Sequence, residues 1–313
     1  MNRITLKTRL AAAALLLAAA VQASCQSTAT APANGEKAAA TAPIRYGPGR
    51  QLATLANRRI AESSGIAASR LRDGVFWTHN DSDDGPRLYA FDKAGRDLGS
   101  VTLEGAKARD WEDIASFERG GKSWLLVGDI GNNLRDQKTG TLYLVPEPAI
   151  DPDNPADTQV APAVTIRFSY ADGPQDCEAL AVDATAGKIY LAAKALLPLC
   201  KIYELPLSDE QPAEPLTARH VATVTISLAT GMDISPDGRR MVICNYSEAA
   251  ELTRHEDESW AKALDRLPRR LGLPSRRQGE AICYGSDGRS LYLTSEQLPT
   301  PLLELPAQDG PRD

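Results

Sequence analysis

The segment Asp110-Trp-Glu-Asp-Ile114 has four counterparts elsewhere in the chain, and this repetition decides the fold. Each segment combines polar or small residues and closes on an apolar one. The five segments are Glu62-Ser-Ser-Gly-Ile66, Asp110-Trp-Glu-Asp-Ile114, Asp176-Cys-Glu-Ala-Leu180, Thr230-Gly-Met-Asp-Ile234 and Gln278-Gly-Glu-Ala-Ile282. Their closing residues lie 48, 66, 54 and 48 residues apart. This spacing is typical of the blades of a β-propeller.

The same order of strands and turns follows the start of every segment. An apolar strand leads to a turn glycine, and a second apolar strand follows that turn. The turn glycines are Gly74, Gly121, Gly187, Gly238 and Gly288. Third strands are expected at Leu88–Phe91, Leu142–Val145, Ile202–Leu205 and Leu302–Leu305. Short strands of this composition, separated by glycine turns, indicate an all-β repeat rather than alternating strands and helices.

A fourth strand is expected before each segment. These strands are Leu52–Leu55, Val101–Leu103, Val164–Phe168, Val221–Val224 and Arg270–Leu273. Because the chain begins with a fourth strand and ends with a third, its N-terminal strand can complete the last blade and remove an open edge. We therefore predict an all-β fold, a single β-propeller of five four-stranded blades closed by the N-terminal strand, with six blades as the alternative. In the fourth blade we interpret Asp257–Leu267 as a short helix in place of the third strand.

The N-terminus has the pattern of a secretory signal. A basic start precedes an apolar run from Leu10 to Val21, which is too short to span a bilayer. The basic residues are Arg3, Lys7 and Arg9. Two processing patterns compete: Val21-Gln22-Ala23 is a small-residue cleavage site, and Ala23-Ser24-Cys25 resembles a lipobox.

The residues after Cys25 favour the lipoprotein pattern. The stretch Gln26–Pro43 is rich in Ala, Thr, Ser and Pro, a composition that behaves as a flexible tether. We therefore expect a signal peptide over 1–24, a disordered tether over 25–48 and a propeller domain over 49–313. The protein would then be exported to the periplasm and anchored to the outer membrane through a lipid on Cys25.

The charge of the chain excludes one class of partner. Without the three basic residues of the signal, 32 basic residues face 41 acidic ones, a net charge of −9. An acidic exported domain is poorly suited to nucleic acid or to anionic membrane surfaces. We expect a monomer that meets the membrane only through its lipid and whose partner is a small polar ligand or a glycan.

Polar residues interrupt the apolar pattern at one end of every blade. The second strands end at Asp81, Asp129, Lys194, Asn245 and Glu296. Three of the first strands begin beside a glutamate, at Glu112, Glu178 and Glu280. Because the start of a first strand and the end of a second lie at the same end of an antiparallel hairpin, we expect these side chains to converge at the mouth of a central channel.

A ring of several carboxylates and one lysine needs a compensating charge. Neighbouring carboxylates raise one another's pKa, so protons or a cation must balance them. Oxygen ligands favour Ca²⁺ or Mg²⁺ over zinc or copper. The candidate cation ligands are Asp81, Glu112, Asp129 and Asn132. The candidate ligand-binding residues are Asn80, Asn245 and Glu296.

These segments resemble a group of bacterial exported β-propeller lipoproteins. More distantly, they are similar to the SdiA-regulated periplasmic propellers and to the esterase-like or phytase-like propellers. The likeness covers Leu52–Pro306 and includes Thr78-His-Asn-Asp81, Gly128-Asp-Ile-Gly-Asn132 and Asp233-Ile-Ser-Pro-Asp-Gly238 besides the repeated segments. It implies a propeller fold, export and a divalent cation, and it carries over no catalytic residue. The lysine-rich, multi-calcium phosphate site of propeller phytases is not recognisable here.

Three functions fit this pattern. The first is an envelope-anchored propeller that binds a divalent cation and a small polar ligand or glycan in its mouth. The second is a metal-assisted or carboxylate-based hydrolase of esters, phosphates or glycosides, with Glu178 and Glu280 in acid–base roles and Lys194 stabilising developing negative charge. The third is a protein-interaction scaffold whose polar ring is structural.

Two further expectations concern cysteine and arginine. Cys177 and Cys200 fall at the mouth end of the third blade and are favoured as a disulfide in an exported protein. Cys244 and Cys283 are expected as small buried side chains. A basic run is expected to form a solvated face; its members are Arg266, Arg269, Arg270, Arg276 and Arg277.

Overall fold

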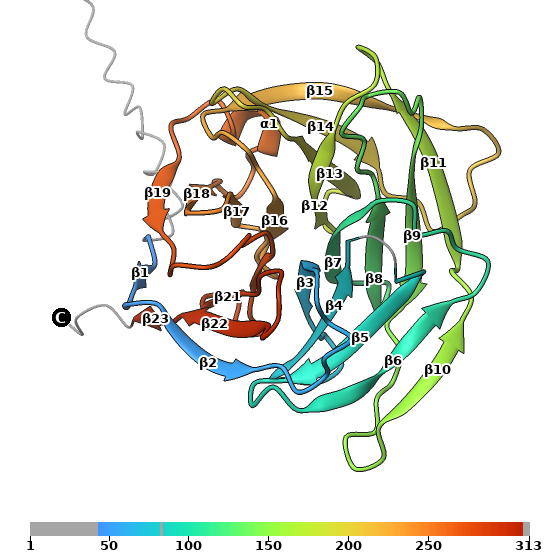
Figure 1. Cartoon of the computed structure of the whole chain (residues 1–313). Helices are drawn as coiled ribbons and strands as arrows, with labels where there is room; N and C mark the ends of the chain where they lie inside the picture. Colours follow the sequence, from blue (N-terminus) through green and yellow to red (C-terminus); the bar gives the residue numbers. More distant parts are fainter. Residues whose placement is uncertain (1–42, 82–83, 309–313) are drawn as a thin grey trace, which may run out of the picture. The chain divides into compact units, whose positions relative to one another are not determined.

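The computed structural model describes residues 43–81 and 84–308, which form a β-propeller of five blades (Figure 1). The first strands of the blades contact one another in a closed ring, in the order β3, β7, β12, β16, β20 and back to β3. The fold predicted from the repeats is therefore confirmed, and the alternative of six blades is wrong. The signal peptide and Cys25 lie outside the described residues.

In blades 1 to 4, four antiparallel strands follow one another from the channel outward in the order in which they occur along the chain. Blade 1 comprises β3 (Ser63–Ala68), β4 (Val75–Asn80), β5 (Arg87–Asp92) and β6 (Asp97–Leu103). Blade 2 comprises β7 (Trp111–Arg119), β8 (Lys122–Asp129), β9 (Gly140–Pro146) and β11 (Val164–Tyr170). Blade 3 comprises β12 (Cys177–Asp183), β13 (Lys188–Ala193), β14 (Cys200–Pro206) and β15 (Leu216–Val224). Blade 4 comprises β16 (Gly231–Ile234), β17 (Arg240–Cys244), β18 (Glu248–Thr253) and β19 (Arg269–Gly272).

Blade 5 is closed by the N-terminal part of the chain, as predicted. Its strands are β20 (Ile282–Tyr284), β21 (Leu291–Leu293), β22 (Pro301–Leu305) and β2 (Arg50–Thr54). The Arg50 guanidinium lies 2.7 Å from Glu304 Oε2 on the neighbouring strand. One more pairing precedes the expected domain start at residue 49, because β1 (Arg45–Tyr46) pairs with β23 (Ala307–Gln308).

The hydrophobic core lies between the blades. Five clusters of buried apolar side chains fill the five interfaces, one between each pair of neighbouring blades. In the interface of blades 1 and 2, for example, Trp77 and Trp111 are almost fully buried. Each sheet therefore has two apolar faces, which explains why the strand sequences are nearly continuous apolar runs rather than alternating ones.

Two sequence-based expectations are wrong. The helix α1 (Trp260–Ala263) does not replace a third strand in blade 4, because β18 pairs between β17 and β19 before the helix begins. The disulfide between Cys177 and Cys200 is absent, and both thiols are free and buried. Cys177 lies on β12 and Cys200 on β14, and β13 separates these strands. Two strand spacings, about 9.5 Å, exceed the reach of a disulfide.

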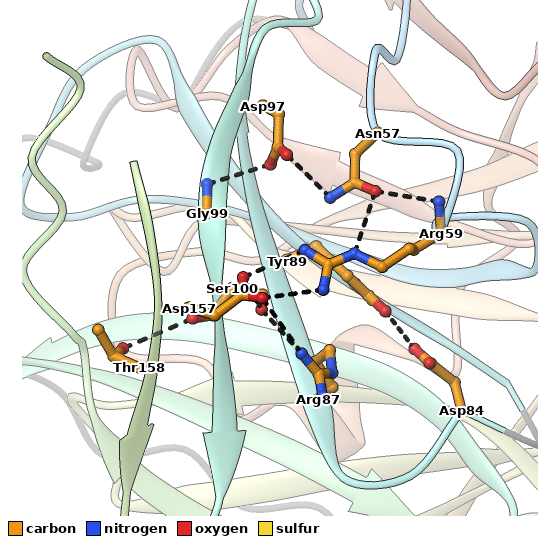
Figure 2. A network of polar contacts seen from close by, with 10 residues as sticks. All are labelled: Asn57, Arg59, Asp84, Arg87, Tyr89, Asp97, Gly99, Ser100, Asp157 and Thr158. Carbon is orange, nitrogen blue, oxygen red and sulfur yellow. Dashed lines mark hydrogen bonds and ion pairs between the residues drawn. The ribbon is translucent and has the colours of Figure 1, made fainter. Parts of the chain in front are cut away.

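Two outer pairings join neighbouring blades. The outermost strands of blades 2 and 3, β11 and β15, pair in parallel. The connection between β9 and β11 forms β10 (Ala156–Val160), which adds a parallel fifth strand to blade 1 beside β6. Figure 2 shows how Asp157 holds β10 in place: it accepts two hydrogen bonds from Arg59, at 3.0 and 3.1 Å, and one from Ser100 at 2.7 Å.

Buried aspartates link the first strands around the channel. Asp113 on β7 accepts hydrogen bonds from the backbone N–H groups of Ile114, Leu180 and Met232. Asp233 on β16 accepts hydrogen bonds from the N–H groups of Ile234 and Tyr284. Both carboxylates occupy the residue before the closing apolar residue of their repeated segment. They stabilise the ring because each binds N–H groups on more than one blade.

Asp233 is expected to make stability depend on pH. Burial raises its pKa from 3.8 to about 6, against the lowering effect of Arg70. The folded state thus holds this proton more tightly than the unfolded state, so the contribution of Asp233 to stability falls as pH rises from about 4 to about 6. The loss amounts to at most about 3 kcal/mol and is complete above that range.

The Asp233→Asn variant isolates this effect because asparagine does not titrate. We expect the free energy of unfolding of the wild type, minus that of the variant, to be larger at pH 4 than at pH 7.5. Urea unfolding at both pH values measures this difference. A difference independent of pH would show that Asp233 does not titrate in this range.

Candidate functional site

The mouth of the channel is the end at which the first strands begin. Backbone hydrogen bonds fix the strand ends here: the N–H of Asp81 donates to Glu62 O at 3.0 Å within blade 1, and the N–H of Trp111 in blade 2 donates to Asp81 O at 3.1 Å. Glu62 and Glu296 form an isolated antiparallel bridge between blades 1 and 5. The end of β4 is thereby fixed beside the start of β7, and this positions the acidic side chains of both.

Three carboxylates from blades 1 and 2 form a compact acidic cluster at the mouth, which we call the acidic triad. Asp81, Asp110 and Glu112 each offer an oxygen, and these three atoms lie within 4.8 Å of one another. Glu112 is buried, with an exposed fraction of 4%. Asp81 Oδ1 is buried and has no hydrogen-bond partner in the structure. A buried oxygen that accepts no hydrogen bond lowers the stability of the folded protein. A hydrogen-bond donor or a cation next to Asp81 Oδ1 would offset this loss.

Gly131 makes room for the triad. A Cβ atom at this position would overlap with Glu112 Oε1 and would lie 2.5 Å from Asp110 Oδ2. The N–H of Gly131 donates to Asp110 O at 3.2 Å, so the loop that follows β8 is held against the start of β7. The absence of a side chain at Gly131 is therefore what lets the carboxylates of Asp110 and Glu112 occupy this space.

The carboxyl groups of the mouth favour their protonated forms. Burial raises the pKa of Asp81, Glu178 and Glu280 to about 7 each. Burial also raises the pKa of Asp110, Glu112 and Glu296. The negative charges of neighbouring carboxylates add to the effect at Asp81, Glu112 and Glu280. The ring therefore lacks compensating positive charge near neutral pH.

Lys194 is the positively charged side chain that the sequence predicts among these carboxylates. Its Nζ lies 2.6 Å from Glu178 Oε2 and 5.7 Å from the centre of the Tyr246 ring. The nearby Glu178 carboxylate raises the pKa of Lys194 despite its burial, so the ammonium group stays charged. On the opposite side of the channel, Ser64 Oγ donates to Glu112 O at 2.8 Å and lies 3.4 Å from Glu280 Oε2.

The structure brings some of the sequence-predicted site residues together and directs others to the backbone. Asp81 and Glu112 share the acidic triad. Glu178 forms an ion pair with Lys194, and burial and the negative charge of Glu296 raise the pKa of Glu280. We call these four residues the adjoining wall of the mouth. Asp129 instead accepts a hydrogen bond from the N–H of Asp110 at 3.0 Å.

The three predicted asparagines hold loops. Asn80 Oδ1 accepts hydrogen bonds from the N–H groups of Ala61 and Glu62. Asn132 binds the backbone of Gln137 through both its oxygen and its nitrogen. Asn245 Oδ1 accepts hydrogen bonds from the N–H groups of Ser247 and Glu248. Their side-chain amides thus fix the loops that carry the acidic residues.

The basic run is only partly solvated: Arg266, Arg270 and Arg277 are exposed, whereas Arg269 and Arg276 are half-buried. Arg266, Arg269 and Arg270 form ion pairs with Glu258, Glu251 and Glu248. Arg276 enters the wall between blades 4 and 5, where it donates to the backbone oxygens of Asn245 and Ala281. Burial lowers the pKa of Arg276.

Comparisons with known proteins give matches among solved structures alone. No protein-family model matches the chain, and no curated protein matches it. Among solved structures, the chain is similar to one described as the structure of the Dos1 propeller, with a TM-score of 0.38 and 7% sequence identity. This match covers 85% of the present chain and 96% of the other. Within the described residues, no helix combines the length and apolar character needed to cross a membrane.

Proposed function

We propose that this propeller binds a divalent cation at the acidic triad and a small polar ligand or glycan on the adjoining wall of the mouth. The observation that carries the proposal is the convergence of Asp81, Asp110 and Glu112 within 4.8 Å, with Asp81 Oδ1 buried and without a donor. A cation would balance the negative charge of these carboxylates. Three carboxylates beside the ends of strands leave further coordination positions for water and for the ligand.

The donor set narrows the choice of cation. All three groups offer oxygen, which suits hard cations such as Ca²⁺ and Mg²⁺, and neither histidine nor thiolate takes part. His79, whose ring packs edge-on against Trp111, is fully buried. Burial lowers the pKa of His79 to about 4, so it stays neutral and adds no positive charge to the mouth.

Direct titration tests cation binding. We expect Ca²⁺ or Mg²⁺ added to EDTA-treated protein to raise the melting temperature and to give a saturable signal in calorimetry. Asp110→Asn should weaken cation affinity by at least about tenfold because it removes one of three charges. Glu214→Gln, at an exposed carboxylate in the loop between β14 and β15, serves as the matched control. Equal affinities for wild type and Asp110→Asn would refute the proposed site.

The second candidate function is a hydrolase at the same mouth. One observation favours it: the pKa of Glu178 and of Glu280 is about 7, which suits general acid–base catalysis near neutral pH. Glu178→Gln separates the two functions. It should abolish turnover of an ester, phosphate or glycoside panel if the protein is a hydrolase, and should only weaken ligand binding if the protein is a binding module.

The location of this function rests on the N-terminal sequence. We propose that the propeller is exported and lipid-anchored through Cys25, supported by the basic start, the apolar run and the tether-like composition that follows. Fractionation of cells that express the Cys25→Ala variant tests this. The variant should move from the membrane to the soluble fraction, and an unchanged distribution would argue against the anchor.

A further inference from the structure

The channel has a second opening, which we call the turn end because the turns between first and second strands surround it. A cavity of about 460 Å³ lies here, and all five blades contribute to its lining. One residue from each blade marks its circumference: Arg70, Ser116, Asp183, Ser235 and Ser286. Its volume falls in the range of about 300–1,000 Å³ that small-molecule sites occupy.

Two arginines, Arg70 and Arg72, line this cavity together with the acidic residues Asp73, Glu118 and Asp183. The Arg70 side chain is half-buried, and its Nε and Nη2 donate to Ser116 O at 3.3 and 3.2 Å. Arg72 is exposed at the rim of the same cavity. In the described part of the chain, neither guanidinium forms an ion pair with a carboxylate.

Of the acidic residues that line the cavity, Asp183 is paired, and Asp73 and Glu118 are exposed to solvent. Asp183 lies 2.6 Å from Arg254 Nη1 and accepts a hydrogen bond from the N–H of Ala186. Asp73 accepts a hydrogen bond from the Ser286 hydroxyl. Glu118 is exposed at the end of β7. The positive charge of Arg70 is therefore held in place by a backbone carbonyl and remains available to a bound anion.

The remaining lining combines hydroxyl groups with apolar side chains. Ser69, Ser116 and Ser235 contribute hydroxyl groups. Phe117, Val182 and Ile234 contribute apolar surface, although each is buried to 6% exposure or less, and Leu71, 55% exposed, stands at the entrance. A ligand with an anionic group and a short apolar body would match the arginines and this apolar part of the lining.

We propose that the turn-end cavity binds a small carboxylate with an apolar body, such as an aromatic or short-chain carboxylic acid. Arg70 and Arg72 hold the carboxylate, since the planar guanidinium group matches its two oxygens. The apolar body packs against Phe117, Val182 and Ile234. This site is independent of the acidic mouth, because the two lie at opposite ends of the first strands.

Titration with benzoate and hexanoate tests this site. The matched neutral probes are benzamide and hexanamide, which keep the shape and lose the charge. EDTA is present throughout, so that no cation at the mouth can recruit the acids. We expect the acids to bind to the wild type at least about tenfold more tightly than the amides, as a charge-assisted hydrogen bond predicts.

Two variants test whether Arg70 and Arg72 bind the carboxylate group of the acids. Arg70→Gln and Arg72→Gln should each lower the affinity for the acids toward that for the amides. Arg72→Gln keeps the test valid if Arg70→Gln fails to fold, because the Arg72 side chain makes no structural hydrogen bond in the described residues. Arg58→Gln, at another exposed arginine, is the control and should bind the acids as the wild type does. Absence of acid binding, equal binding of amides, or an equal loss in Arg58→Gln would overturn the proposal.

Discussion

Replacing Asp113 by alanine is expected to lower the free energy of unfolding by roughly 4 kcal/mol, the largest loss from a single side chain that we anticipate. Its carboxylate accepts hydrogen bonds from three backbone N–H groups, on Ile114, Leu180 and Met232, at 2.8, 2.9 and 3.1 Å. These groups belong to three blades. Alanine would leave all three buried donors unpaired at the point where the first strands meet.

Two companion variants make this result interpretable. Asp113→Asn keeps one carbonyl oxygen and should lose less stability than the alanine variant. Asp136→Ala removes an exposed carboxylate and should stay within about 0.5 kcal/mol of the wild type. Urea unfolding measures all three. A loss below about 1 kcal/mol for Asp113→Ala would mean that other contacts hold the ring.

The number and order of blades could be predicted from the sequence because every blade repeats one pattern. The segment closing on Ile114 and its four counterparts recur at blade-length spacing, and an N-terminal strand without a blade of its own had to complete the last one. The third strand of blade 4, β18, was not predicted from the repeat. Glu248–Thr253 contains two alanines and two glutamates, residues that favour helices, and only its pairing with β17 and β19 makes it a strand.

β10 could not be predicted for a related reason. Its residues, Ala156–Val160, are largely exposed and carry no apolar face. Their position depends on hydrogen bonds to a strand of another blade, and on Arg59, almost a hundred residues earlier. The alternation of apolar and polar residues indicates which faces of a strand are buried. It therefore cannot predict a strand that is held mainly by backbone hydrogen bonds along its edge.

The same distinction applies to the mouth. Glutamates at strand starts could be located because each interrupts a buried strand, and Asp81 follows the end of one. Asp110 and Gly131 were missed as members of the cluster because both lie in loops, whose course depends on contacts such as the hydrogen bond from Gly131 N–H to Asp110 O. The asparagines show a limit of sequence reasoning, since an amide that fixes a turn and one that binds a ligand look alike in sequence.

Two of the five arginines in the basic run, Arg269 and Arg276, were misjudged from sequence alone. A dense basic run suggests a solvated face, but Arg269 pairs with Glu251, which is almost fully buried, and Arg276 enters the wall of the channel. The partners that decide these positions belong to other strands of the same blade or to the neighbouring blade. The sequence therefore gives the net charge of the protein, but it does not predict where individual charged side chains lie in the fold.

Gly131→Ala is expected to abolish cation binding at the mouth, with a loss of affinity of at least about 100-fold. The added methyl group would overlap with Glu112 Oε1 and crowd the Asp110 carboxylate, so the two side chains must separate and the triad opens. The backbone tolerates the change, because the φ angle of Gly131 is not positive. The protein should therefore fold while losing its cation site.

Gly272→Ala is the matched control, since a Cβ atom there meets no atom within 4 Å. Calorimetric titration with Ca²⁺ and Mg²⁺ should give wild-type affinity for this variant and none for Gly131→Ala. Melting curves in EDTA show whether both variants fold. If folded Gly131→Ala bound the cation as tightly as the wild type, the cation could not lie among Asp81, Asp110 and Glu112, because a methyl group placed against two of these carboxylates cannot leave their geometry unchanged.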